Sequence, residues 1–354
     1  MANKLKKLIK KQLQKVSLRR YHRSHKEIAE ELLNSIESEK GKTNPLFKKL
    51  SYEYSQDVFG NKCYAPWLIV YAAITGDFIA GWIPDNYYGK IVVPYKSGFY
   101  GIIPTGVKSL SSKLLHTPYL PDRAYYVSGL FFTSSWEVIP REQVKDYIFS
   151  NNDKVVFKED ISYQGQGVYL FTKETFDVGK IYNFGNGVFQ SYIYQHPFFS
   201  EIMPDSVATL RLTTVIEDSG KPSCRAAIMR FGRHNDTHCK WAADIKIPVD
   251  VKTGKLNETG YLPNWKTLTS HPDTNVVFKG KVIPKYNACV AYALQMHLAV
   301  PFSRSIGWDL IVNENEEVQL MEFNGGHNDI KFSEATQGPC FADLGWEKLW
   351  KKKL

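Results

Sequence analysis

The sequence predicts an α+β protein with more than one lobe, and three observations support this. Short runs of β-branched and aromatic residues follow one another from about residue 106 to 249, whereas one clear amphipathic helical pattern comes only at 286–298. Regular alternation of strand and helix patterns, which is typical of a parallel sheet, is missing. The chain has 354 residues, of which 43% are hydrophobic, and this is enough apolar material for more than one core.

The first 26 residues predict a basic helix. They contain ten Lys or Arg and no acid, so the rest of the chain is almost neutral, with 35 bases and 36 acids. A cationic amphipathic helix of this kind lies on anionic lipid. A solvated surface helix is the alternative, and a nucleic-acid partner is not expected because the segment has a single aromatic residue. The apolar residues that recur at helical spacing among the bases are Leu5, Leu8, Ile9, Leu13 and Val16.

Nothing in the sequence predicts a membrane span or a secretory signal. No apolar run reaches the roughly 20 residues that a spanning helix needs, and the basic N-terminus lacks the apolar core and cleavage site of a signal peptide. The mature chain is therefore expected to start near Met1 and to stay in the cytoplasm, with peripheral attachment to the inner face of the membrane through residues 1–23. The five cysteines are odd in number and widely spaced, so they are expected to be reduced.

The elements expected after the basic helix are short. A second helix is expected at 24–39, and the aromatic segment 65–100 is ambiguous. The segment 108–115 is helical or loop-like, and a helix is expected at 141–149. The expected strands are 125–132, 154–157, 168–171, 188–194, 208–216, 226–231, 245–249, 306–312 and 318–323.

The last two strands form a hairpin that carries two acids and an amide. If the polar turn at 313–317 centres near Asn315 or Glu316, Asp309 lies opposite Glu322 to within one residue of register. Asn324 is two residues farther and therefore projects from the same face as Glu322. Facing carboxylates destabilise a sheet unless a cation lies between them, and Mg²⁺ prefers oxygen ligands of this kind. Asp309, Glu322 and Asn324 are therefore the candidate magnesium ligands, and solvent-exposed acids at a strand end are the alternative.

A strand ending in Lys158 is followed by a glycine loop and a second strand. Glycines let backbone N–H groups close on oxygens, so this arrangement is typical of a lid over phosphates. The loop has neither the third glycine and following helix of a dinucleotide-binding fold nor the Lys-Ser/Thr ending of a P-loop. A plain hairpin turn is the alternative. The candidate phosphate contacts here are Lys158, Ser162, Gly165, Gln166 and Gly167.

Further basic residues indicate contacts to anionic groups. Arg211 interrupts a β-branched strand, and a buried guanidinium requires an anion, either a carboxylate or a phosphate. Lys113 is a second candidate for phosphate binding, and a surface lysine is the alternative. The candidate contacts to a second, acidic ligand are Arg225, Arg230, Arg233 and Asn328.

Taken in order, several of these segments resemble the ATP-grasp superfamily. They are Lys158 with its glycine loop, Gln190-Ser191-Tyr192-Ile193, Thr209-Leu210-Arg211, Gly307-Trp308-Asp309 and Glu322-Phe323-Asn324. Three segments narrow the resemblance to the branch associated with sugar transfer and surface-polysaccharide loci, over residues 105–340: His271-Pro272-Asp273-Thr274, Ile283-Pro284 and Ile306-Gly307-Trp308-Asp309. The chain departs from many relatives in having Gln190 and Ser191 where they place an acid.

The resemblance implies an ATP-grasp fold, in which two α+β subdomains grip ATP. The expected organisation is a basic helix at 1–26, an N-terminal region at 27–105, a subdomain with the glycine loop at 106–187 and a subdomain with the metal site at 188–354. Arg211 would neutralise the transferred phosphoryl group and, with Lys158, is a candidate catalytic residue. The resemblance further implies phosphate and adenine-side contacts from Lys113 and Lys158, an adenine hinge at Gln190, Ser191, Tyr192 and Ile193, and Mg²⁺ ligation by Asp309, Glu322 and Asn324.

The function implied is that of an ATP- and Mg²⁺-dependent ligase that joins a carboxylic acid to an amine through an acylphosphate. The expected partners are a carboxylated sugar of a surface polysaccharide and an amino acid or a similar amine. This chemistry depends on positioning and electrostatic stabilisation and requires no protein nucleophile, and the sequence shows no convincing Ser-His-Asp or Cys-His arrangement. A sugar or polyol kinase and a non-catalytic nucleotide-binding scaffold are the alternatives.

Overall fold

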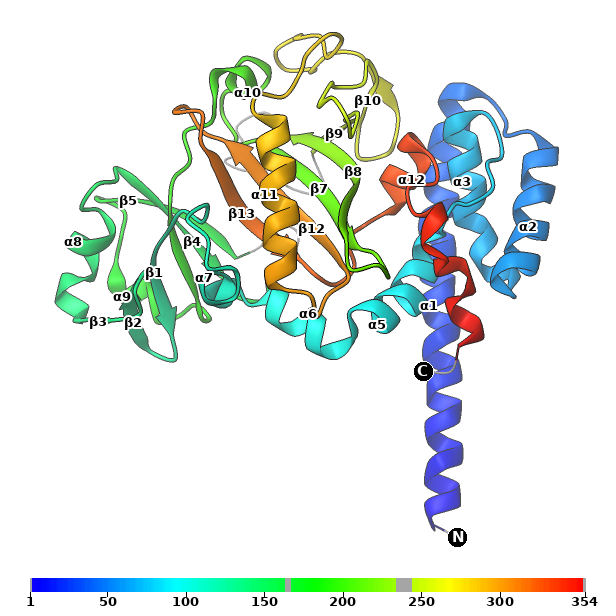
Figure 1. The fold of residues 1–354 in the computed structure, drawn as a ribbon, viewed down its shortest axis with the longest axis horizontal. Helices are drawn as coiled ribbons and strands as arrows, with labels where there is room; N and C mark the ends of the chain where they lie inside the picture. The colour runs from blue at the N-terminus through cyan, green and yellow to red at the C-terminus, as the bar shows by residue number, and fades with distance from the viewer. Residues whose placement is uncertain (1, 163–166, 234–243, 353–354) are drawn as a thin grey trace. The chain divides into compact units, whose positions relative to one another are not determined.

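The computed structural model describes residues 2–162, 167–233 and 244–352, and the chain forms two compact units (Figure 1). Unit 1 comprises residues 1–95, 264–266 and 329–354, and unit 2 comprises residues 96–263 and 267–328. Within the described residues, no helix is both long enough and apolar enough to cross a membrane.

The longest helix of unit 1 is a single element. α1 (Ala2–Lys40) runs without a break through residue 24, where the sequence pattern suggests the start of a second helix. No Gly or Pro occurs before Gly41, which has a φ of 86° and follows the end of the helix. Nothing in the backbone therefore interrupts the helical hydrogen bonds, and the prediction of two separate helices is wrong.

The aromatic segment of ambiguous pattern is helical and forms the core of unit 1. α3 (Ala65–Thr75) is buried on nearly every side, so its sequence lacks an amphipathic stripe. The side chains of Trp67, Tyr71, Trp82, Tyr87 and Trp346 are each at most 1% exposed. The other elements of this part of the chain are α2 (Pro45–Phe59), η1 (Lys62–Tyr64), α3 (Ala65–Thr75), α4 (Asp85–Tyr87), the π-helical η2 (Tyr88–Val92), α5 (Val93–Lys96), α12 (Lys331–Gln337), η5 (Ala342–Leu344) and η6 (Trp346–Lys351).

A buried carboxylate ties the C-terminal residues to this core. Glu334 accepts hydrogen bonds from the backbone N–H groups of Ile83, at 2.5 Å, and Cys340, at 2.8 Å. Burial raises the pKa of Glu334 well above its ordinary value, although both hydrogen bonds act in the opposite direction. Residues 329–354, which the sequence groups with the metal-site segment, thus pack in unit 1.

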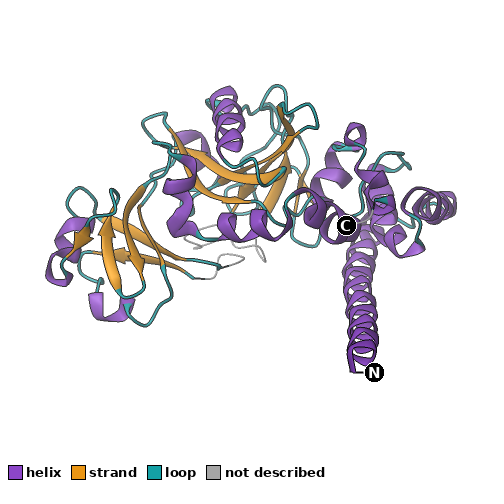
Figure 2. Cartoon of the chain, turned by 60° about the horizontal axis from the view of Figure 1, so that its bottom comes forward, coloured by secondary structure: helices purple, strands orange, loops and turns teal. Residues whose placement is uncertain are grey.

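Unit 2 contains two antiparallel sheets, which Figure 2 shows as separate groups of strands. The first has the strand order β3-β2-β1-β6-β4-β5 and the second the order β11-β10-β9-β8-β7-β12-β13. The strands of the first are β1 (Asp122–Val127), β2 (Leu130–Thr133), β3 (Val138–Ile139), β4 (Lys154–Glu159), β5 (Val168–Thr172) and β6 (Gly187–Ser191). Those of the second are β7 (Thr209–Ile216), β8 (Pro222–Phe231), β9 (Ile245–Pro248), β10 (Gly260–Tyr261), β11 (Thr267–Leu268), β12 (Ser305–Val312) and β13 (Val318–Asn324).

The helices of unit 2 lie between and beside these strands. They are α6 (Gly98–Gly106), η3 (Lys108–Leu110), α7 (Ser111–Leu115), η4 (Arg141–Gln143), α8 (Val144–Ile148), α9 (Val178–Ile181), α10 (Pro197–Ile202) and α11 (Tyr286–Ala299). The mixture of helices and antiparallel sheets confirms the α+β class. One expected strand, 125–132, is instead the hairpin of β1 and β2, because Ser128 and Gly129 turn the chain with φ values of 51° and 86°.

The seven-stranded sheet has one apolar and one charged face. Leu210, Met229 and Ile247 are opposite one another on β7, β8 and β9 and are buried in the core that also includes residues of α11. Successive side chains of a strand point to opposite faces, so the neighbours Arg211 and Lys246 lie on the other face. This alternation places the candidate site on the side of the sheet that α11 does not cover.

Candidate functional site

Three side chains meet on the charged face where β7, β12 and β13 lie side by side. Asp309 on β12 is directly opposite Arg211 on β7 and Glu322 on β13, and this confirms the predicted pairing of Asp309 with Glu322. The ladder shifts by one residue between Asp309 and Leu310, since Leu310 is opposite Leu320. Asn324 lies two residues beyond Glu322 on the same face, and its amide donates to the Glu322 carboxylate at 3.4 Å. The hairpin therefore brings the candidate metal ligands into one neighbourhood.

Asp309 and Arg211 form a buried, bidentate ion pair. Nε of Arg211 donates to one carboxylate oxygen of Asp309, and Nη2 donates to the other at 2.7 Å. Burial alone would raise the pKa of Asp309, but Arg211, together with Arg230 and a hydrogen bond with Glu322, outweighs this effect and lowers the pKa. The sequence predicts that Asp309 binds the metal and that Arg211 contacts the phosphoryl group. In the structure, Arg211 instead donates to both carboxylate oxygens of Asp309.

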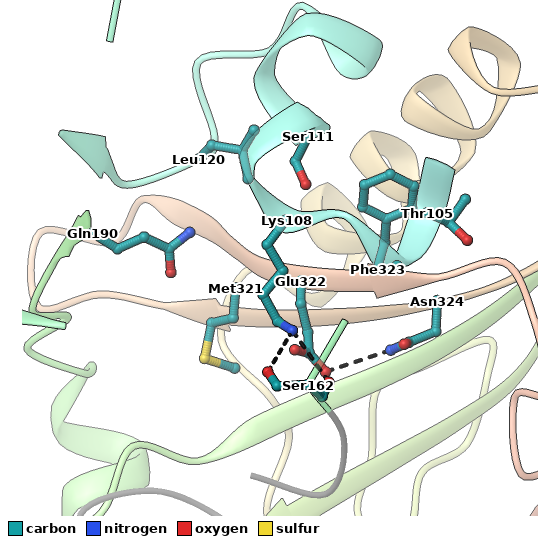
Figure 3. Close-up of a pocket in the computed structure, with 11 residues that line it drawn as sticks. Thr105, Lys108, Ser111, Leu120, Ser162, Gln190, Met321, Glu322, Phe323 and Asn324 are labelled. Carbon is teal, nitrogen blue, oxygen red and sulfur yellow. Dashed lines mark hydrogen bonds between the residues drawn. The ribbon is translucent and has the colours of Figure 1, made fainter. Parts of the chain in front are cut away.

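Glu322 and Asn324 line a polar pocket of about 410 Å³, open mouth included (Figure 3). Lys108 reaches the same pocket, where its ammonium donates to Oγ of Ser162 at 2.9 Å and to the backbone carbonyls of Glu159 and Ser162. Within the described ranges, no cluster of three or more His, Cys, Asp or Glu is able to hold a metal ion. The other lining residues are Thr105, Gly106, Ser111, Leu120, Gln190, Met321 and Phe323.

A second, mainly apolar pocket of about 540 Å³ shares Gln190 and Met321 with the polar one. Lys158 lies in its wall and donates to the carbonyl oxygen of Met321 at 3.2 Å. Burial lowers the pKa of Lys158, and the nearby Glu322 carboxylate acts in the opposite direction. The remaining lining residues are Val156, Val168, Leu170, Ser191, Tyr192, Ile193 and Val207, so the structure brings the predicted hinge residues and Lys158 together.

Gln190, which lines both pockets, is hydrogen-bonded to the neighbouring strand β1. The Gln190 side chain is 4% exposed and donates to the Asp122 carboxylate at 2.8 Å. Burial raises the pKa of Asp122, while the hydrogen bonds from Gln190 and Tyr125 oppose the rise. An acid is thus present beside the hinge, but it comes from the neighbouring strand and could not be found from the hinge sequence.

Several predicted site residues lie elsewhere. Lys113 is exposed, and its ammonium is 3.9 Å from the centre of the Trp136 ring rather than in the pocket lining. Arg225 donates to Glu217, and Arg233 donates to Asp273. Asn328, by contrast, lies near the site: it donates to Ser305, and its amide oxygen is beside Gly307, as is the Arg211 side chain. Gly167 follows the glycine loop with a φ of 66°, while Gly165 and Gln166 fall outside the described residues.

A second charged cluster lies on the same sheet face. Nε of Arg230 donates to the fully buried Asp244 at 2.5 Å, and Lys246 is directly opposite Arg230 on β9. Burial lowers the pKa of Lys246 to about 8, with Asp244 opposing and both Arg230 and Arg211 adding to the shift. Asp244 and Lys246 were not expected from the sequence, and the one signal for Lys246 is a charged residue within the apolar strand Ile-Lys-Ile-Pro.

An apolar pocket and a polar pocket, each bordered by strands of both antiparallel sheets, agree with the ATP-grasp class that the sequence motifs predict. The family model of sugar-transfer associated ATP-grasp proteins matches residues 131–342. This match spans more than half of the 354 residues, and the chain belongs to that family. The resemblance inferred from the sequence motifs is thereby confirmed.

Comparison with solved structures gave distant similarities, and the search of curated proteins gave no match. The D-alanine-D-alanine ligase of Coxiella burnetii is 10% identical, with a TM-score of 0.40 over 70% of this chain and 59% of that one. The N5-carboxyaminoimidazole synthetase of Staphylococcus aureus, solved with ADP, is 9% identical, with a TM-score of 0.39 over 63% and 45%. The biotin carboxylase domain of the Hydrogenobacter thermophilus 2-oxoglutarate carboxylase is 10% identical, with a TM-score of 0.38 over 63% and 40%. The chain thus spans between 40% and 59% of these proteins.

Proposed function

We propose that this chain is an ATP-dependent ligase that forms an amide between a carboxylated sugar and an amine through an acylphosphate. The pair of adjoining pockets carries the proposal. An apolar slot bordered by residues 190–193 suits a purine ring, and the polar pocket of Lys108, Glu322 and Asn324 suits a metal-bound polyphosphate. Membership of the sugar-transfer associated family supports a sugar-containing acceptor.

The polar pocket has a donor set that fits Mg²⁺. This ion keeps water and phosphate oxygens as ligands and needs few oxygens from the protein. Glu322 and Asn324, hydrogen-bonded side by side and half-buried, would supply them, with Asp309 sharing its carboxylate between the metal and Arg211. When bound, Mg²⁺ neutralises charge that develops on the β- and γ-phosphates. Lys108 and Lys158 would add positive charge from the pocket walls.

The charged sheet face suits an anionic acceptor. In the proposed reaction a carboxylate oxygen of the sugar attacks the γ-phosphorus, and the bond to the bridging oxygen breaks to release ADP. The amine nitrogen then attacks the acyl carbon, phosphate leaves and the amine gives up a proton. Arg211, Arg230 and Lys246 share this face and would position and stabilise the acid and the phosphoryl group through charge-assisted hydrogen bonds.

The proposal is tested by incubating the full chain with Mg-ATP, a uronic-acid glycan and a panel of amino acids. We expect release of ADP and phosphate that depends on both acceptors, together with a product mass that corresponds to an amide. A phosphorylated sugar without an amide would instead identify a kinase, and ATP binding without turnover would identify a scaffold. Either of these results contradicts the ligase proposal.

The two candidate lysines of the first subdomain can be distinguished by mutation. Lys108→Met should raise the dissociation constant for Mg-ATP at least about tenfold, because a charge-assisted hydrogen bond is worth roughly 1.5–3 kcal/mol. Lys113→Met removes the same charge from an exposed position on Trp136 and should change the constant less than about threefold. Isothermal titration calorimetry measures both. If Lys113→Met weakened Mg-ATP binding more than Lys108→Met, the phosphate contact would belong to Lys113, as the family resemblance implies.

A further inference from the structure

The N-terminal half of α1 has a surface that its own unit does not cover. Every residue from 9 to 20 is exposed, whereas Ala29 and Ile36 in the second half are each 1% exposed. Figure 1 shows α1 extending as a straight helix beyond the other elements of unit 1. Residues 9–20 therefore gain little stability from packing within the unit.

An apolar stripe runs along this uncovered half. Ile9, Leu13 and Val16 are 51%, 65% and 60% exposed and recur at the spacing that aligns side chains on one face of a helix. At about 100° per residue, Ile9 lies roughly 160° around the axis from Ala29. The stripe thus faces away from the side on which α1 packs, so it is not a continuation of the core-facing surface.

The charges of the same half are unbalanced along the helix. The first turn contains no acid, although basic residues near a helix N-terminus are unfavourable for the helix dipole. The first acid of the chain is Glu27, which pairs with Arg23 at 2.9 Å. Most helical stability in proteins comes from the packing of an apolar face, which residues 9–20 do not have within their own unit. An anionic partner would neutralise the bases, and an apolar phase would cover the stripe.

We infer that residues 2–20 form a membrane-surface helix that binds anionic lipid. Ile9, Leu13 and Val16 would enter the boundary between headgroups and acyl chains, while the flanking lysines and arginines would contact the headgroups. Each such base raises the binding constant by roughly fivefold at an anionic surface. A second copy of the helix would bring like charges together, and this segment has no aromatic side chains for stacking on nucleic-acid bases. The inference is independent of the proposed ligase function.

Vesicle flotation with the full chain tests the inference. We expect the chain to float with vesicles of phosphatidylcholine and phosphatidylglycerol, and to bind vesicles of phosphatidylcholine alone at least about tenfold more weakly. The variant Ile9→Asp/Leu13→Asp should lose at least about tenfold in binding to the anionic vesicles. The matched variant Gln14→Asp/Leu18→Asp adds the same charge at positions roughly 140° and 180° around the axis from Ile9, both of them exposed, and should lose less than about threefold.

The controls keep the result unambiguous. Far-UV circular dichroism and thermal unfolding should be the same for both variants, since all four positions are exposed. Equal losses in both variants would overturn the apolar-stripe assignment. Absence of flotation with the anionic vesicles overturns the inference. Binding to a homopolymeric RNA or sedimentation as a dimer would then identify nucleic acid or a second copy of the chain as the partner instead. No arm of the experiment uses ATP turnover, so its failure is distinct from failure of the proposed function.

Discussion

Glu322→Gln should reduce acceptor-dependent ATP turnover by about a hundred- to a thousandfold, the range found when one preorganised charge-stabilising group is removed from an active site. The glutamine keeps the size of the side chain and its hydrogen bond with Asn324 but removes the charge that would balance Mg²⁺. Coupled detection of ADP at saturating acceptor measures the loss in kcat, and a magnesium titration should show a higher concentration for half-maximal rate.

The matched control for this prediction is Glu314→Gln. Glu314 is an exposed carboxylate in the turn of the same hairpin, so its replacement by glutamine removes an equal charge outside the pocket. Its turnover should stay within about twofold of the unmodified chain, because a surface charge so placed is screened by salt. If Glu322→Gln were as active as Glu314→Gln, the polar pocket would not be the metal site.

The hairpin and the long strands were predictable from the sequence because their signals are local. Alternating side chains and a short polar turn place Asp309 within one residue of its position opposite Glu322 without any tertiary information. A register shift between Asp309 and Leu310 then brings Glu322 directly opposite Asp309, and the sequence does not predict this shift. The positions of the lysines depend on long-range packing instead. Lys108 and Lys113 stand five residues apart in one polar segment, and only the fold places one of them in the pocket and the other on Trp136.

The helical core of unit 1 was not predictable for a different physical reason. α3 is surrounded by other elements, so an apolar stripe with a polar opposite face is absent from its sequence. The return of residues 329–354 to this unit depends on Glu334, whose two backbone hydrogen bonds join segments about 250 residues apart in the chain. Likewise, Gln190 is explained by Asp122 on a neighbouring strand. Patterns within a short window carry no information on such partners.

Asp309→Ala should destabilise the chain by about 3–5 kcal/mol, because it leaves the Arg211 guanidinium buried without its carboxylate. Replacing both residues, in Arg211→Met/Asp309→Leu, should recover most of that loss, since a buried ion pair can often be exchanged for apolar side chains of similar volume. Urea denaturation gives the free energies of unfolding. Glu201→Ala, which breaks a more exposed pair with Lys281, should cost at most about 1 kcal/mol.

The same pair predicts how the effect depends on pH. Arg211 makes the pKa of Asp309 lower in the folded chain than in the unfolded chain, where it is about 3.9. The stability contributed by the charged carboxylate is therefore fully present above about pH 4 and is lost as the pH falls through the folded-state pKa. The difference in unfolding free energy between the unmodified chain and Asp309→Ala should be constant from neutral pH to that point and shrink below it. A difference that instead grows on acidification would show that Asp309 is protonated in the folded chain.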